Sequence, residues 1–133
     1  MTPDQLLLSR QLAGLPGFRW EAGMKFPQAK GKGWIRHAGR VYDDEKYTPC
    51  DAIPDLTDDA IGGVLFGWIC ALDDEAHLDR SNGALRITVH GYVPCASTDH
   101  VDRDDHGGRW WTVTGATLAE ASARALLAIG RCA

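Results

Sequence analysis

A stretch rich in histidine and aspartate, STDHVDRDDHGGRWW at 97–111, carries side-chain types that bind metals or transfer protons. The candidates are Asp99, His100, Asp102, Asp104, Asp105 and His106. In an extended chain, at roughly 3.3 Å per residue, the two histidines would be about 20 Å apart. The ligands of one zinc ion all lie about 2.0–2.3 Å from the metal. An extended segment therefore cannot gather these residues around one ion.

A calcium loop is not supported in this stretch either. Asp102, Asp104 and Gly107 match the opening of the calcium-binding loop found between two helices, but Val113 stands where its bidentate glutamate belongs. We therefore expect a polar hairpin loop that turns at Gly107-Gly108, with no metal and no cofactor.

The cysteines offer no clear nucleophile. They are Cys50, Cys70, Cys95 and Cys132. A reactive thiol needs an electropositive, partly exposed setting, whereas Cys70 adjoins an apolar stripe and Cys132 lies near the end of the sequence. No CxxC pair and no hydrolase, metalloprotease or dinucleotide-binding motif occurs. No catalytic residue is identified, which favours a non-enzymatic role and leaves an enzyme as the alternative.

The composition of the 133-residue chain fits one domain over 1–133. Apolar residues make up 44% and charged residues 24%, as in ordinary globular proteins. The net charge of −4 argues against nucleic-acid binding, which needs clustered Lys and Arg. The N-terminus lacks the pattern of a signal peptide, and no apolar run approaches the ~20 residues that cross a bilayer. We expect a cytoplasmic protein with reduced cysteines and no membrane contact.

The first of three predicted helices begins at Thr2. Pro3 fits the first helical position and Gln5 completes a capping box. Gly14 and Pro16 are expected to end this helix.

The second predicted helix starts at Thr57 and presents one apolar stripe. The stripe is formed by Ile61, Val64, Leu65, Trp68, Ile69 and Leu72. We expect Trp68 to lie in the core and Gly62-Gly63 to let the helix approach a sheet. The acidic run at 73–75 is expected to form a solvated end.

The third predicted helix has Thr117 and Glu120 as its capping box and Gly130 as its C-cap. Its inward stripe is Leu118, Ala121, Ala125, Leu126 and Ile129. Small alanine side chains there would allow tight packing on a sheet.

Four segments read as strands. They are FRWEAGMKF (18–26), GWIRHAGRVY (33–42), ALRITVHGYV (84–93) and RWWTVTG (109–115). Trp111 is expected in the core. The predicted class is α+β: a mainly antiparallel sheet of about four strands, with three helices packed as layers in an α-β-α sandwich.

Three further tryptophans are candidates for binding a partner protein. The sequence leaves two arrangements open, and in one of them Trp20, Trp34 and Trp110, with Tyr92, lie on an exposed sheet face, where aromatic side chains serve protein recognition. The alternative is that a second layer of helices covers them. An exposed face would also favour a homodimer.

The segments PDLTDDAIGGVLFGWICAL and TGATLAEASARALLAIG, taken together, resemble the small phage and prophage proteins of the phage ABA sandwich domain type, over residues 54–130. Those proteins show a proline-led helix start, a strand pair containing tryptophans, and a threonine-capped, alanine-rich helix. The long loop at 96–108 and the Gly62-Gly63 pair depart from that pattern. The resemblance implies an α–β–α layered fold and a phage or prophage origin, and it supplies no catalytic residues.

Two functions follow from these patterns. The first is a phage or prophage accessory protein that is not an enzyme and binds a host or phage protein. The alternative is a small hydrolase or metal-dependent enzyme that uses the 99–106 loop with His90. The alternative requires these side chains to converge in a pocket.

Overall fold

The computed structural model describes residues 1–21, 24, 53–91, 100–103 and 109–133, and of 100–103 and 109 only the main chain. Its elements are α1 (Pro3–Ala13), α2 (Asp59–Leu72), β1 (His77–Ser81), β2 (Ala84–His90), β3 (His100–Arg103), β4 (Arg109–Gly115) and α3 (Leu118–Ile129). Helices with an antiparallel sheet confirm the α+β class. No described helix is long and apolar enough to cross a membrane.

Helices α1 and α3 begin and end where their capping signals predict. The Thr2 hydroxyl accepts the Gln5 N–H at 3.2 Å, and Gln5 Oε1 accepts the Thr2 N–H at 2.9 Å, so the capping box is complete. At α3, the Thr117 hydroxyl accepts the Glu120 N–H at 3.1 Å, but the return bond from the Thr117 N–H to the Glu120 carboxylate is not found among the described residues, so only half of the predicted capping box forms. Gly130 ends α3 in the left-handed conformation, with φ of 93°. Local hydrogen bonds therefore set these helix ends.

Helix α2 starts one residue later than predicted. Asp58 is its N-cap and forms no side-chain capping hydrogen bond. Thr57 instead belongs to a turn in which Asp55 Oδ1 accepts its N–H at 3.0 Å and its hydroxyl at 2.6 Å. The predicted stripe faces inward, with Ile61, Leu65, Trp68 and Ile69 buried and Val64 and Leu72 half-buried.

The antiparallel sheet has the strand order β1-β2-β4-β3. Strands β2 and β4 were predicted and lie at its centre, where Ile87 pairs with Val113 and Val89 with Trp111. Strands β1 and β3 flank them and were not predicted. Pairing of β3 with β4 ends at Arg103 and Arg109, so part of the expected loop is a strand of a hairpin.

The two strands predicted in the first third of the chain do not contribute described strands. Residues 18–21 and 24, from the predicted strand 18–26, have no regular secondary structure. The other residues of that strand, and all of 33–42, lie outside the described residues.

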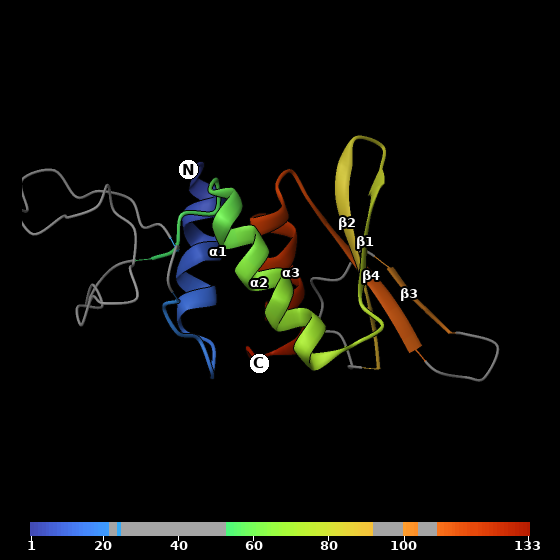
Figure 1. The fold of residues 1–133 in the computed structure, drawn as a ribbon. Coiled ribbons are helices and arrows are strands. Elements are labelled where there is room, and N and C mark those ends of the chain that lie inside the picture. Colours follow the sequence, from blue (N-terminus) through green and yellow to red (C-terminus); the bar gives the residue numbers. More distant parts are fainter. Residues whose placement is uncertain (22–23, 25–52, 92–99, 104–108) are drawn as a thin grey trace, which may run out of the picture.

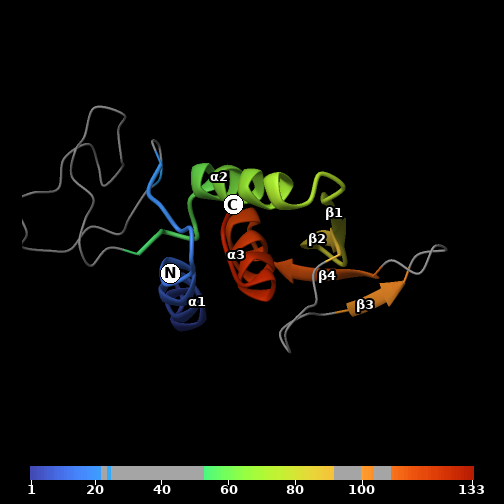
Figure 2. The same cartoon turned by 90° about the horizontal axis from the view of Figure 1, so that it is seen from below.

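The three helices lie on one side of the sheet (Figure 1). Helix α3 packs against β2 and β4, while α1 and α2 pack against α3 (Figure 2). The described elements therefore form a helical layer and a sheet layer. This differs from the expected sandwich, because none of the described helices covers the other face of the sheet.

One buried core joins the two layers, and Trp68 and Trp111 lie in it as predicted. Its close packing depends on glycine. A Cβ added at Gly115 would lie 2.5 Å from the Ala121 main-chain nitrogen, so β4 and α3 approach closely there. A Cβ added at Gly62 would lie 2.9 Å from Leu118 Cβ. Gly62 thus brings α2 close to α3, rather than to the sheet as expected.

Candidate functional site

The four residues predicted to bind a partner do not form one described cluster. Trp34 and Tyr92 lie outside the described residues. Trp20 follows α1 and packs edge-on against Phe18, with 5.7 Å between ring centroids. Trp110 is half-buried in β4. The segment after α1 and strand β4 lie on opposite sides of α3, so Trp20 and Trp110 belong to two separate surfaces (Figure 2).

The first surface is the face of the sheet that points away from α3, which we call the outer face. Ile87, Val89, Trp111 and Val113 are fully buried toward the helices. Alternation along a strand therefore turns the residues between them outward. The described outer-face residues are His77, Asp79, Ser81, Ala84, Arg86, Thr88, His90, Trp110, Thr112 and Thr114.

The outer face has a threonine centre and a rim of longer side chains. Thr88 and Thr112 pair across β2 and β4, and each is only 6% exposed. His77, opposite Thr88 on β1, is exposed, and His90 and Trp110 are half-buried. The face thus presents imidazole and indole groups around small, nearly buried threonines.

An ion pair fixes one end of the outer face. Arg86 donates to both oxygens of Asp79, from Nε at 2.8 Å and from Nη2 at 2.6 Å. The hydrogen bonds and charge of Arg86 lower the pKa of the Asp79 carboxyl, and the same contact raises the pKa of the guanidinium. His77 adds a smaller effect that also lowers the pKa of Asp79. This bidentate geometry holds the guanidinium in one orientation.

A carboxylate fixes the other end. Asp73 is the C-cap of α2, and its side chain is only 8% exposed, so the expected solvated end is wrong for Asp73. Asp74 and Glu75 are exposed as expected. Its Oδ2 accepts the main-chain N–H of His90 at 2.7 Å. The His90 ring lies 6.2 Å from that of His77, and its buried Nδ1 lies 3.4 Å from Asp73 Oδ2 without forming a hydrogen bond to a described residue. Asp73 therefore positions His90, whose ring lies near that of His77.

In the histidine- and aspartate-rich stretch at 97–111, Asp99, Asp104, Asp105 and His106 lie outside the described residues. Only the main chain of His100 and Asp102 is placed, in β3. Asp102 pairs with Trp110, which pairs with His90, so β3 lies two strands, or about 10 Å, from β2. Within the described ranges, no group of three or more His, Cys, Asp or Glu side chains is arranged to hold a metal ion.

The two described cysteines are free thiols with raised pKa values. Burial, helped by the charge of Asp73, raises the pKa of the Cys70 thiol. Burial also raises the pKa of Cys132, against a smaller lowering by Arg19. An activated thiolate nucleophile needs the opposite shift. Cys50 and Cys95 lie outside the described residues.

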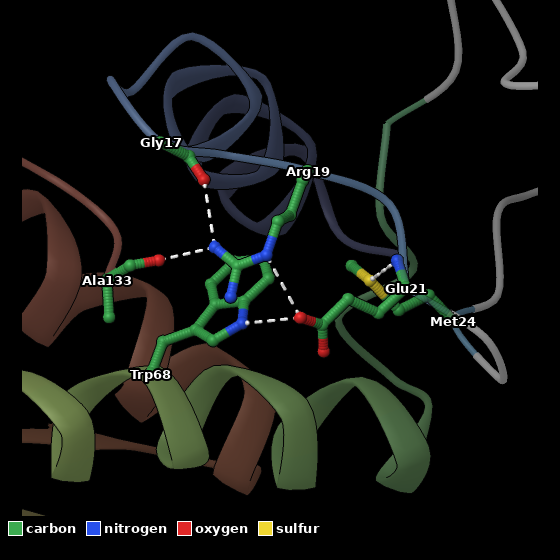
Figure 3. A network of polar contacts seen from close by, with 6 residues as sticks. All are labelled: Gly17, Arg19, Glu21, Met24, Trp68 and Ala133. Atoms are coloured by element: carbon green, nitrogen blue, oxygen red, sulfur yellow. Dashed lines mark hydrogen bonds and ion pairs between the residues drawn. The ribbon is translucent and has the colours of Figure 1, made fainter.

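The second surface surrounds Trp68 and was not predicted (Figure 3). The guanidinium of Arg19 lies 4.7 Å from the centroid of the Trp68 ring. Oε1 of Glu21 accepts from Arg19 Nε at 3.0 Å and from Trp68 Nε1 at 3.2 Å. Arg19 also donates to the main-chain oxygens of Gly17 and Ala133. These contacts bury the indole. The sequence indicates that Trp68 is a core residue, but it does not indicate which polar side chains contact the ring.

Comparisons with protein-family models, curated proteins and solved structures give no match for this chain. The resemblance to phage sandwich-domain proteins therefore stays a prediction. The functional argument rests on the two surfaces themselves.

Proposed function

We propose that the chain is a small phage or prophage accessory protein, not an enzyme, that works in the host cytoplasm. On this proposal it binds a host or phage protein through the outer face of its sheet. The observation that carries the proposal is the position of Trp110: half-buried, and on the face that no described helix covers.

The side chains around Trp110 suit protein recognition. Binding hot spots are rich in Trp and Arg, held in fixed positions. Trp110 and Arg86 lie on the same face, and Asp79 already orients the guanidinium at 2.6–2.8 Å. Asp73 places His90 beside the indole. Because these groups are positioned before binding, little side-chain entropy would be lost on contact.

The layer arrangement supports the same site. A sheet with one face packed on helices and the other free is a common antiparallel design. A partner laid on the outer face would supply the third layer that the described elements lack. The described outer face mixes acidic and basic groups, so the partner surface would be mainly apolar and hydrogen-bonding rather than strongly charged.

Affinity capture from infected or lysogenic cells tests the proposal. Tagged wild-type chain is compared with Trp110→Ala and with Leu7→Ala, which removes an exposed leucine of α1. A host or phage protein retained by wild type and Leu7→Ala, and lost from Trp110→Ala, is the expected result. Equal capture by all three would refute binding at this face. If Trp110→Ala fails to fold, His77→Ala on the exposed rim takes its place.

A further inference from the structure

We propose that residues 16–21, which we call the strap, move as a unit between a closed state that covers Trp68 and an open state that exposes it, while α2 stays folded. The side chain of Arg19, which we call the latch, holds the strap closed. The strap lies between α1 and the undescribed segment, and its side chains cover the indole (Figure 3). The inference is independent of the proposed partner-binding face, because the strap lies on the other side of α3 (Figure 2).

Among the described residues, the strap contacts distant parts of the chain mainly through its side chains. Among main-chain hydrogen bonds between described residues, one joins it to a distant part of the chain, from the Cys132 N–H to Pro16 O at 2.9 Å. The bonds from the Phe18 N–H to Leu15 O and from the Met24 N–H to Glu21 O, both at 3.1 Å, are local. A segment outside any helix or sheet ladder can open at a lower free energy than the core. The strap meets this condition, whereas α2 has a full helical ladder.

The latch is exposed to solvent although it covers a buried ring. The side chains of Arg19 and Glu21 are 47% and 38% exposed, while Trp68 is 4% exposed. Dissolved salt screens such an exposed ion pair. Glu21 Oε1 accepts from both Arg19 and the Trp68 indole N–H, so Arg19 helps to hold the carboxylate that binds the indole donor.

The hinge lies at Gly17. Its φ is +82°, a conformation that other residues rarely adopt. A Cβ at this position would lie 2.8 Å from Cys132 O. Closure of the strap therefore depends on a glycine at its N-terminal end and on arginine contacts at its centre.

Opening would change the surface in two ways. It would expose the Trp68 ring, against which Phe18 packs edge-on with 5.9 Å between centroids. It would also displace Trp20, which packs edge-on against Phe18. The strap therefore controls whether an aromatic surface beside α2 is covered.

Hydrogen exchange measured by NMR on the full chain tests the inference. We expect the Trp68 indole N–H to exchange at least ~10-fold faster than the main-chain amides of Leu65 and Ile69, as local opening requires. High salt should accelerate exchange of the indole proton only. Arg19→Ala should do the same, and Arg131→Ala, which removes an exposed charge near the same end of the chain, should not.

Two results would overturn the inference. One is exchange of the indole proton at the same rate as the α2 amides, which would mean that Trp68 is exposed only when the helix unfolds. The other is indole exchange that responds to neither salt nor Arg19→Ala. The salt series uses wild-type protein, so it still tests whether the strap opens locally if Arg19→Ala does not fold.

Discussion

Oδ2 of Asp73 lies 2.7 Å from the main-chain nitrogen of His90 and 3.4 Å from its Nδ1. One carboxylate at the end of α2 thus holds the last residue of β2. Its other oxygen accepts the Glu75 N–H at 3.0 Å and shapes the turn into β1. The junction between the helical layer and the sheet depends on this side chain.

Replacing Asp73 should therefore weaken the fold. Asp73→Ala removes a charged acceptor from two main-chain N–H groups and should lower the free energy of unfolding by about 2 kcal/mol. Asp74→Ala, at the exposed neighbouring position, should change it by less than about 0.5 kcal/mol. Urea denaturation of both variants measures the difference. Equal effects would mean that Asp73 does not fasten the junction.

Adjacent glycines of α2 should respond to alanine with opposite signs. Gly63 faces open space, so Gly63→Ala should stabilise the protein by up to about 1 kcal/mol through helix propensity. Gly62→Ala should destabilise it, because the new methyl would lie 2.9 Å from Leu118 Cβ and push α2 from α3. Thermal unfolding of the pair tests this, and a gain in stability at both positions would contradict the packing described.

Replacing either of two buried serines by alanine should also change stability in opposite directions. Ser122 Oγ has no hydrogen-bond partner among the described residues, so Ser122→Ala should stabilise α3 by about 1 kcal/mol. Ser9 Oγ donates to Pro54 O, and Ser9→Ala should cost about 1 kcal/mol because that carbonyl loses its donor. Denaturation midpoints decide between them. A loss of stability in Ser122→Ala would show that its hydroxyl does have a partner.

Acid should remove the contribution of the Asp79–Arg86 pair. The pKa of Asp79 is lowered in the folded state, so the pair stabilises the fold above the unfolded value of about 3.9, and this contribution disappears as pH falls through the lower folded value. The difference in melting temperature between wild type and Asp79→Asn should be present at neutral pH and vanish in strong acid. A difference independent of pH would exclude the pair as its source.

Capping patterns in the sequence predicted those helix ends that are fixed by hydrogen bonds between residues close together in the chain. The capping box of Thr2 and Gln5 and the glycine cap at Gly130 needed no tertiary information. The predicted start of α2 at Thr57 was wrong by one residue, because the Thr57 hydroxyl donates to Asp55 in a turn instead of capping the helix. At Glu120 the carboxylate accepts from Gln5 Nε2 at 3.5 Å, a contact that links α3 to α1.

The two edge strands and the long-range contacts could not be predicted from the pattern of apolar and polar residues in the sequence. Strand β1, HLDRS, has no apolar alternation, because pairing to β2 rather than burial of a face makes it a strand. Asp73 contacts His90, which lies 17 residues away, and Arg19 contacts Ala133, which lies 114 residues away. The central strands β2 and β4 were predicted because each buries one face, which leaves a clear alternation in the sequence.

Oxidative labelling of the neighbouring Trp110 and Trp111 tests most directly whether the outer face is free to bind. In the isolated monomer, Trp110 should be oxidised while Trp111, which is fully buried, stays unmodified, and a bound partner should protect Trp110. Protection of Trp110 as strong as that of Trp111 in the isolated monomer would show that the outer face is already covered and would contradict the proposed binding site.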